Sequence, residues 1–308
     1  MTWHLHGAII TPFGTAANNR GENEGNITTL QKLLWRGSVH TTVSAEAIRW
    51  AIRYFWQRLS AERSELATNR QWNDDRDDNT WRDQKWTAWD GDGGEGTYID
   101  DDVLGFMLAE GAKSDGSDIA SPKGKKAKGT IEKRRGALEV TRAVSSTPFA
   151  GDITFNAKSG TKGSTSLYGT EVHATRFQYG FTLTPERLRV RRRALDTLDA
   201  IVALGEVAGN HSRFHYDFSP DSIVLRLTHD PAPRLLYCFD DESEPVRMTE
   251  LARKVEAGDI DAKELWLGGA ISTTEQAKEI ARRGARSEAG VVPTSHALKT
   301  ELKKVLAL

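Results

Sequence analysis

Four strand patterns and two helix patterns follow one another in the order strand, helix, strand, strand, helix, strand. The first strand is predicted at WHLHGAII (3–10), where Trp3 and Leu5 alternate with His4 and His6. Alternation of this kind is typical of a strand with one buried face. The order of the patterns predicts a mixed α+β fold.

Both helices are predicted from apolar residues at helical spacing. The first begins at Ser44, which we expect to be the N-cap, and continues to about Leu59. The second lies in RALDTLDAIVALGEVAG (193–209) and ends at a glycine. Arg49 and Arg53 are four residues apart in the first helix, so they share one face, offset from the apolar stripe.

The other strands are predicted in the second half of the chain. ALEVTRAVSS (137–146) is one candidate, and two β-rich arms around the tract 159–166 predict a long hairpin. SIVLRLT (222–228) and RLLYCF (234–239) also fit strands. Thr11 to Asn26 has no apolar periodicity and is predicted to be a loop.

The C-terminal part is predicted to contain three helical segments. They lie at about 248–257, after a capping box at Ser272–Glu275, and at 295–308. Taken with the earlier elements, the strand and helix order is that of ferredoxin-like and RNA-recognition modules. We therefore expect such a core in residues 1–230, with a C-terminal strand and helices in 231–308 packing on it.

Residues 61–135 form a polar, glycine-rich and charged insertion, interrupted by YIDDDVLGFML (98–108), which is expected to make a short buried segment. Between Trp72 and Asp102 eleven acidic residues stand against three basic ones, whereas Ser121 to Arg135 has seven basic residues and one acid. Although the net charge is only −1, this segregation suits a protein that binds a polyanion on one surface and copies of itself on others.

Composition excludes several classes of protein. No apolar run approaches the roughly 18 residues of a membrane helix, and the N-terminus lacks the zones of a signal peptide, so we expect a cytoplasmic protein without a membrane partner. The lone Cys238 cannot form an intramolecular disulfide. The histidines form no ligand cluster with the cysteine and no nucleotide-binding glycine motif is present, so no metal or cofactor is expected.

Residues 18–53, NNRGENEGNITTLQKLLWRGSVHTTVSAEAIRWAIR, resemble the N-terminal signature of the Cas-seven family of CRISPR-associated proteins, within the RAMP superfamily. Three further stretches are similar to the DevR autoregulator branch: YIDDDVLGFM (98–107), LYGTEVHATRFQYGFTL (167–183) and AGNHSRFHYDFSPDSIVLR (208–226). The likeness covers most of residues 3–230.

This resemblance implies a modified RNA-recognition fold, with a palm insertion and a β-hairpin thumb, that polymerises along guide RNA. The partners it implies are crRNA, other copies of the chain, a Cas-five-like subunit, the large and small Cascade subunits, and target DNA in the assembled type I complex. The RNA contacts it implies are Asn18, Asn19, Arg20, His40, Ser44, Arg49 and Arg53. The thumb falls at about 149–167, with Phe149, Phe155, Lys158 and Lys162.

Elementary chemistry agrees with a phosphate site on the first helix. Guanidinium groups bind phosphate oxygens through paired hydrogen bonds, and the free N–H groups near Ser44 add a further anion site. Such contacts ignore base identity, as a carrier of arbitrary guides requires. The alternative is that Arg49 and Arg53 form an ordinary solvated helix face.

Other motifs have two interpretations each. Trp72, Trp81, Trp86 and Trp89 suit base stacking, but the acids around them favour a small cluster of their own or a contact with an adjacent subunit. RLRVRRR (187–193) contacts RNA or pairs with neighbouring acids, and the run Lys123 to Lys128 is a solvated loop or a steering patch. Asp100 to Asp102 are expected either to act as a cap or to form an ion-pairing edge.

Enzymatic activity is the competing class of function. Relatives in the superfamily cleave target RNA with an aspartate in the loop after the first strand, where this chain has Glu22 and Glu24. We therefore expect no catalytic residues and a scaffold, with an endoribonuclease as the alternative. A solitary RNA-binding or regulatory protein is a third possibility.

Overall fold

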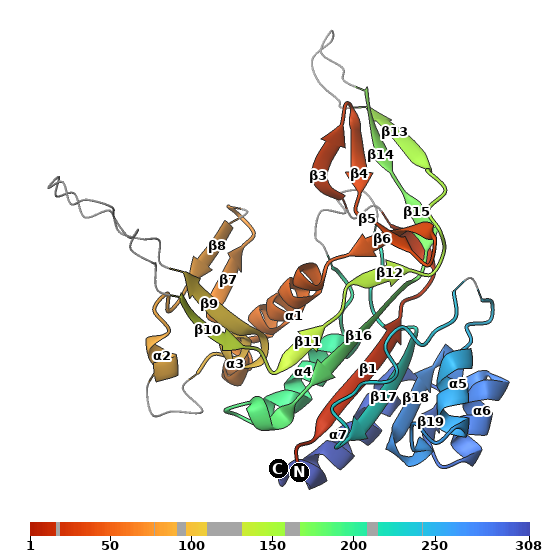
Figure 1. Ribbon diagram of the computed structural model, residues 1–308. Coiled ribbons are helices and arrows are strands. Elements are labelled where there is room, and N and C mark those ends of the chain that lie inside the picture. The colour runs from red at the N-terminus through yellow and green to blue at the C-terminus, as the bar shows by residue number, and fades with distance from the viewer. Residues whose placement is uncertain are drawn as a thin grey trace, which may run out of the picture.

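A computed structural model describes residues 1–16, 19–76, 78–90, 97–109, 131–157, 167–207, 215–241 and 243–308. Within them the side chains of residues 19–22, 90, 108, 109, 131, 132 and 156 are not described. The chain is a mixed α/β protein in which one large sheet has helices on both faces and smaller hairpins project from it (Figure 1).

Short strands are concentrated in the first two thirds of the chain. The strands are β1 (His4–Ile10), β2 (Gly14–Ala16), β3 (Asn19–Glu24), β4 (Ile27–Leu30), β5 (Lys32–Trp35), β6 (Ser38–Val43), β7 (Arg70–Asn73), β8 (Asp78–Trp81), β9 (Gly105–Ala109), β10 (Ile131–Arg135), β11 (Leu138–Val140), β12 (Ala143–Ser145), β13 (Ile153–Ala157), β14 (Leu167–Glu171), β15 (His173–Thr175), β16 (Phe177–Leu183), β17 (Ser222–Thr228), β18 (Leu265–Gly269) and β19 (Arg286–Glu288). The α-helices are α1 (Ala45–Leu59), α2 (Thr87–Asp90), α3 (Ile99–Leu104), α4 (Arg193–Val202), α5 (Thr249–Glu256), α6 (Glu275–Arg282) and α7 (Val291–Leu306).

The central sheet has the strand order β19-β18-β17-β1-β16-β12-β6-β5, and β11 also pairs with β16. β1 lies in its middle, antiparallel to both neighbours, so that Leu5 is opposite Leu183 on one side and Leu227 on the other. The predicted strands at 3–10, 137–146, 177–183 and 222–228 therefore belong to one sheet, although they are far apart in sequence.

One face of this sheet packs against α1, α4 and α7. Leu5 and Ile9 of β1 contribute to this core, and from α1 the side chains of Ile48, Ile52 and Trp56, spaced four residues apart, are completely buried there. Such spacing places the three on one side of the helix. Trp56 also donates through Nε1 to the Asp196 carbonyl at 3.2 Å, which joins α1 to α4.

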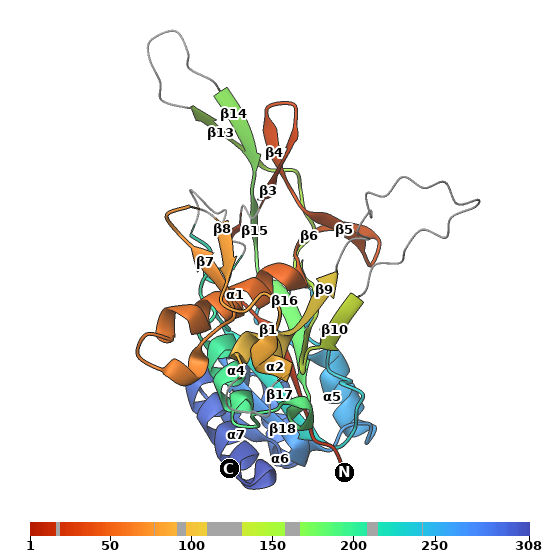
Figure 2. The ribbon, with the colours of Figure 1, turned by 90° about the vertical axis from the view of Figure 1, so that its left-hand side faces the viewer.

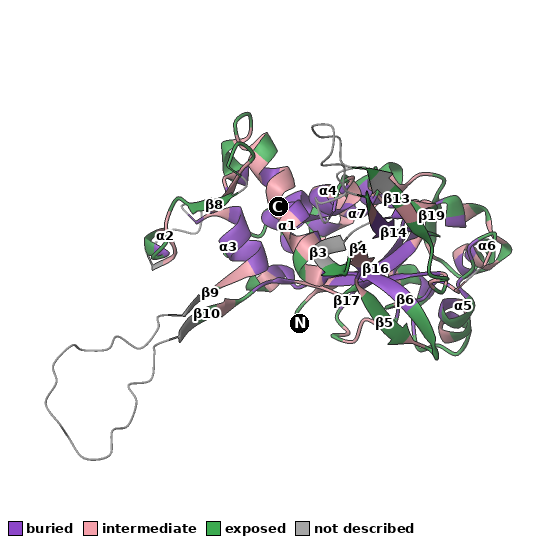
Figure 3. Cartoon of the chain, turned by 90° about the horizontal axis from the view of Figure 1, so that it is seen from above, coloured by how far each residue is buried: buried purple, intermediate pink, exposed green. Residues whose placement is uncertain are grey.

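The opposite face of the sheet packs against α5, α6 and the segment that precedes α5. Ala8 and Ile10, which alternate with Leu5 and Ile9 along β1, are part of this second core together with Leu251 of α5. Because β1 is covered on both faces, it is buried along nearly its whole length. Its neighbour β16 is likewise almost entirely buried (Figure 3).

Gly7 lies where β1 passes closest to the aromatic face of β16. A Cβ atom at this position would lie 2.1 Å from Cε1 of Phe181, its cross-strand partner. Both strands lie inside the central sheet, and the Phe181 ring is buried in the core. The ring therefore cannot move aside without displacing the side chains packed around it. Glycine is needed here for close packing rather than for an unusual backbone angle.

The predicted loop at Thr11 to Asn26 is wrong in part, since it contains β2, β3 and the turn into β4. β3 and β4 form an antiparallel hairpin that joins the β13–β14 hairpin through the parallel pair of β4 and β14. This four-stranded sheet projects away from the body of the protein (Figure 2). Asn23, Glu24, Gly25 and Asn26 are exposed, and exposed residues at a turn show no apolar alternation in the sequence.

The prediction of a strand at RLLYCF is also wrong. Residues 234–239 form turns, and Arg234 and Tyr237 have positive φ angles of 58° and 52°. The run is apolar because Leu235, Cys238 and Phe239 fill the second core. The strand of this region is instead β18, which pairs with β17 and was not predicted, and β19 extends the same edge.

Helix starts were predicted with mixed success. Ser44 is the N-cap of α1, and its hydroxyl accepts from the Ala47 N–H at 3.2 Å, which confirms the prediction. The N-cap of α6 is Thr274, not Ser272, because Ser272 lies in a 3₁₀ turn at Ala270–Thr273. In the described residues no helix is long and apolar enough to span a membrane.

Candidate nucleic-acid interface

His40 and Ser44 stand at the junction between β6 and α1. His40 is 3% exposed, and its Nδ1 lies 2.7 Å from the Ser145 carbonyl oxygen. Ser44 is equally buried and caps α1. Both side chains have partners inside the protein, so they fix the start of the helix that carries Arg49 and Arg53.

Arg49 and Arg53 contact the short helix α3. The Arg53 Nε donates to the Asp100 carboxylate at 3.0 Å, and Arg49 donates to the Leu104 carbonyl. Burial lowers the pKa of Arg49, and the neighbouring Arg53 adds to this effect; an arginine remains charged all the same. The two guanidinium groups are therefore part of an α1–α3 contact rather than a freely solvated face.

A third arginine, Arg70, lies beside this pair and was missed from the sequence. Its backbone N–H donates to Asp100 at 3.1 Å, and its guanidinium lies over the Trp81 ring, 5.5 Å from the centroid. Burial and the nearby Arg53 charge lower its pKa. Arg49, Arg53 and Arg70 are called here the α1 arginine cluster. Arg53 pairs with Asp100, whereas the guanidinium of Arg49 donates to the Leu104 carbonyl and that of Arg70 to the Asn79 side chain. No periodicity in the sequence signals Arg70.

The three adjacent aspartates of α3 each have their own partners. Asp100 binds Arg53, whereas Asp101 accepts from Trp86 Nε1 and Asn69 Nδ2, each at 2.9 Å. Asp102 forms ion pairs with two further arginines, Arg134 and Arg193. Residues 99–104 of the predicted buried segment are buried and its ion pairing is confirmed for Asp100 and Asp102, but Met107 near its end is 66% exposed. The helix α3 joins the insertion to α1 and α4.

The tryptophans of the insertion belong to clusters within the chain. Trp86 is 5% exposed and stacks on Phe106 with ring centroids 4.5 Å apart, while Trp81 and Trp89 meet the same pair edge-on. Trp72 contacts Trp50 of α1. These contacts support the cluster interpretation over base stacking.

The hairpin predicted at 149–167 is present as β13 and β14, which pair antiparallel. Phe155 of β13 is 78% exposed at the projecting end. Phe149 lies at its base, where the ring contacts His173 edge-on and Lys32 lies over it. Aromatic side chains therefore mark both ends of the projection.

Glu171 joins the two hairpins of the projecting sheet and was not predicted. Its carboxylate accepts from the Leu30 N–H at 2.7 Å and from Lys32 Nζ at 2.6 Å, and the residue is 9% exposed. The Glu171 carboxylate thus links β14 to β4 and β5. It also fixes Lys32, whose ammonium group lies over the Phe149 ring.

Several predicted contacts lie outside the described residues. They are Asn18, Lys158, Lys162 and the run Lys123 to Lys128, together with the side chains of Asn19, Arg20 and Glu22. The backbone of Asn19 and Arg20 belongs to β3, in the projecting sheet. Glu24, at the end of the same strand, is exposed. No group of three potential metal ligands occurs in the parts of the chain that the structure describes.

The fold is similar to that of subunits from CRISPR RNA-guided surveillance complexes. One solved chain of a "CRISPR RNA-guided surveillance complex" has a TM-score of 0.53 at 13% identity, covering 96% of this chain and 98% of that one. A chain of a complex described as "pre-nicking" has a TM-score of 0.56 at 12% identity, covering 98% and 100%. At such low identity the likeness establishes the fold.

Sequence identity then establishes the family. The "CRISPR-associated protein Cas7/Cst2/DevR" of Myxococcus xanthus (strain DK1622) is 51% identical over 308 aligned residues, 96% of this chain and 97% of the relative. No family model matches the chain. The protein belongs to the Cas7/Cst2/DevR family of CRISPR-associated proteins.

Proposed function

We propose that this protein is a guide-RNA-binding backbone subunit of a type I CRISPR interference complex, and that it oligomerises along the spacer of the RNA. The observation that carries this proposal is 51% identity to a family member over 96% of the chain. The solved surveillance-complex chains, which match the fold over nearly their whole length, support it.

The core is proposed to be a ferredoxin-like, RNA-recognition type of fold. In chain order β1, α1, β11/β12, β16, α4 and β17 form the unit, and the sheet order β17-β1-β16-β12 interleaves them with both helices on one face. Residues 1–230 constitute this core, with the insertion at 61–135 and the thumb hairpin at about 149–167. Residues 231–308 pack on it and add β18 and β19.

The guide RNA is proposed to lie against the β6–α1 junction and the β3–β4 hairpin. Arg20, with Asn18 and Asn19, approaches phosphates from the hairpin, and the α1 arginine cluster supplies positive charge from the other side. The mutual repulsion of these arginines supports this, because burial and the Arg53 charge lower the pKa of both Arg49 and Arg70, and a polyanion would offset that repulsion. His40 and Ser44 act by positioning α1.

The projecting sheet is proposed to be the thumb that contacts the next copy in the filament. Ile153, Phe155 and Leu167 of this hairpin are all exposed and lie on one face of it, and a group of exposed apolar side chains is typical of an interaction site. Lys158 and Lys162 are assigned to the same projection. The other proposed partners are a Cas-five-like subunit, the large and small Cascade subunits, and target DNA, all in the cytoplasm.

The proposed role is that of a scaffold and not of a ribonuclease. The exposed carboxylate described near the first strand is Glu24, and an isolated exposed carboxylate is a poor general base. Incubation of the complex with complementary RNA and Mg²⁺ is expected to give no site-specific cuts. Cuts that disappear in Glu22→Gln or Glu24→Gln would contradict the scaffold proposal.

The RNA site can be tested through the RNA that copurifies with the complex. We expect RNA of uniform length, and less of it when Arg49→Ala and Arg53→Ala are combined. The salt dependence of binding should also weaken by about two phosphate contacts. An unchanged RNA content in the double variant would refute the contact of these two arginines with phosphate.

A control is required because Arg53 also holds Asp100. Asp100→Asn weakens the same ion pair but leaves the guanidinium in place. If Arg53 binds phosphate, Asp100→Asn should keep or raise the RNA content. If Arg53 serves only the fold, both variants should lose RNA together.

A further inference from the structure

Five arginines occur between residues 187 and 193, in the segment that connects β16 to α4. The proposed guide-RNA site does not use them. Arg187, Arg189, Arg191 and Arg192 are exposed, whereas Arg193 is buried. The segment therefore contains arginines with two different roles.

Asp102 determines the path of this segment. Its carboxylate, 0% exposed, accepts from the backbone N–H groups of Arg189 and Val190 at 2.9 and 3.1 Å, and pairs with Arg193 at 2.9 Å. Because one buried carboxylate binds the backbone twice, Arg189 and Val190 are held in place, and Arg191 and Arg192, which follow them, are exposed.

Arg189 is held as well, against the aromatic cluster of the insertion. Its guanidinium lies 3.5 Å from the Trp89 ring centroid, and the Arg134 guanidinium lies 4.2 Å from the same ring. The Arg189 guanidinium also donates to the Trp89 carbonyl. These contacts hold the positive charge of Arg189 in place on this surface.

Arg191 and Arg192 have no ion pair with any carboxylate that the structure describes. A nearby acid, Asp196, is already bound by Arg63 at 2.7 Å. Arg187 reaches Glu139 only at 3.9 Å, and Glu139 is shared with Arg135. The exposed cations of this surface clearly outnumber its acids. We call it the α4 arginine surface, and it comprises Arg135, Arg187, Arg189, Arg191 and Arg192.

The position of these charges is unfavourable without a ligand. Arg191, Arg192 and Arg193 stand at the N-terminus of α4, the positive end of the helix dipole, where an acidic residue is normally preferred. Arg192 is the N-cap and provides no side-chain cap. The first N–H groups of the turn donate to Val190 and Arg191, so the arginine side chains are the groups left for an anion.

We propose that the α4 arginine surface binds the phosphodiester backbone of a nucleic-acid strand other than the RNA held at α1. Planar guanidinium groups match phosphate oxygens, and such contacts do not depend on base identity. Arg191 and Arg192 supply the positive charge that no described carboxylate pairs with, whereas Glu139 contacts Arg135 and Arg187. This inference goes beyond the proposed function and does not depend on the α1 contacts.

The test measures binding of the purified, RNA-loaded protein to labelled strands by fluorescence anisotropy over a range of NaCl concentrations. Single-stranded DNA, single-stranded RNA and duplex DNA of mixed sequence serve as separate probes. In Arg191→Gln with Arg192→Gln, the affinity for at least one probe should fall, and the slope of log K against log salt should drop by about 1.5 to 2.

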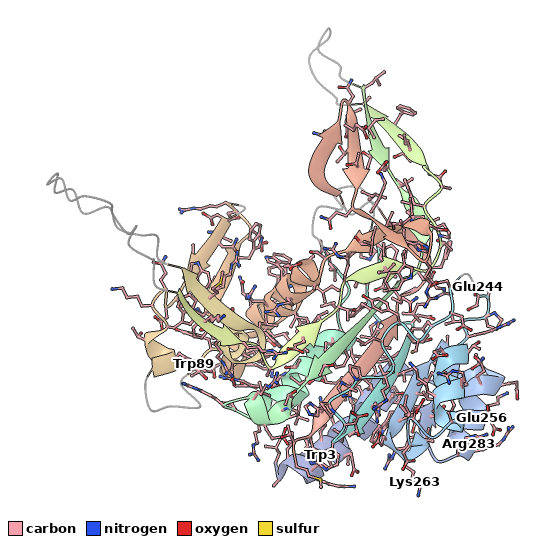
Figure 4. All side chains as sticks on the ribbon, viewed as in Figure 1. Trp3, Trp89, Glu244, Glu256, Lys263 and Arg283 are labelled. Atoms are coloured by element: carbon pink, nitrogen blue, oxygen red, sulfur yellow. The ribbon has the colours of Figure 1, made fainter. Side chains whose placement is uncertain are left out.

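Arg282 and Arg283 provide a matched control. They are also consecutive arginines at a helix end, but both pair with Glu279, and they lie on the opposite side of the molecule from Trp89 (Figure 4). Arg282→Gln with Arg283→Gln should leave affinity and slope unchanged. An equal loss in both pairs would overturn the proposal, because the effect would then be one of net charge.

Two more measurements make the result decisive. The amount of copurified guide RNA should stay the same in Arg191→Gln with Arg192→Gln, and the melting temperature should be equal or higher, since charge leaves the positive end of α4. Loss of guide RNA, or an unchanged affinity and salt slope for every probe, would overturn the assignment. The probe with the largest loss identifies the kind of strand.

Discussion

The Arg53 guanidinium lies 3.0 Å from the Asp100 carboxylate, which is 2% exposed and also accepts backbone N–H groups from Asn69 and Arg70. One arginine of α1 is therefore joined to the insertion 47 residues further along the chain. Any account of Arg53 as an RNA contact must include its contribution to stability.

Removal of the arginine is expected to destabilise the protein. In Arg53→Ala the buried Asp100 charge loses its cation, and the free energy of unfolding should fall by about 3 kcal/mol. Arg58→Ala, an exposed change in the same helix, should stay within about 0.5 kcal/mol of the parent. Urea denaturation measures both. Equal values for the two variants would show that the ion pair contributes nothing.

Gly7 should not tolerate a side chain. The Cβ of Gly7→Ala would overlap the Phe181 ring, and overpacking of this kind is expected to cost about 1–3 kcal/mol in urea denaturation. Gly205→Ala is the control, because nothing lies within 4 Å of its added Cβ. A Gly7→Ala protein as stable as Gly205→Ala would show that the sheet can adjust.

The pH dependence of stability should include a contribution from Asp101. Burial, with the neighbouring Asp100 charge, raises its pKa from 3.8 to about 7. The folded protein thus holds this proton more tightly than the unfolded chain does. The stability that results is fully present below about pH 4 and is lost as the pH rises through 7.

Asp101→Asn tests this contribution. Between about pH 5 and pH 7 the free energy of unfolding of the parent should fall more steeply than that of the variant, by up to about 1.4 kcal/mol per pH unit. Chemical denaturation at several pH values gives both slopes. Parallel curves would mean that Asp101 is ionised in the folded protein throughout.

Cys238 should be unreactive until the second core opens. The residue is 5% exposed, and burial raises the pKa of its thiol to about 12, so thiolate is scarce at neutral pH. Labelling by iodoacetamide should be slow in buffer and fast in denaturant, as followed by mass spectrometry. Rapid labelling of the native protein would indicate that the 235–239 segment detaches on its own.

Elements with one buried face were predictable from the sequence. The helix α1 has Ile48, Ile52 and Trp56 on a single core side, and the same side carries its cap at Ser44. The turn of the β3–β4 hairpin, from Asn23 to Asn26, is exposed and gave no periodic signal. RLLYCF gave a signal for burial, but burial alone does not distinguish a strand from a turn packed into a core.

The candidate site was predictable in its residue types but not in its contacts. The spacing of Arg49 and Arg53 placed them on one helix face, and the family resemblance singled them out as RNA contacts. Their partners, Leu104 and Asp100, follow more than 45 residues later, and Glu171 holds Lys32 across 139 positions. Pairs at such separations are created by the sheet order and leave no local pattern.

The paired strands β9 and β10 have a practical consequence for protein engineering. Ala109 and Ile131 are direct antiparallel partners, so whatever sequence connects them begins and ends at neighbouring points of one ladder. The helix α3 is held by the contacts of Asp100, Asp101 and Asp102, and none of these contacts is with the connection between β9 and β10. A fluorescent reporter or an affinity handle grafted between these two residues would label the assembled complex while leaving the arginine surfaces in place.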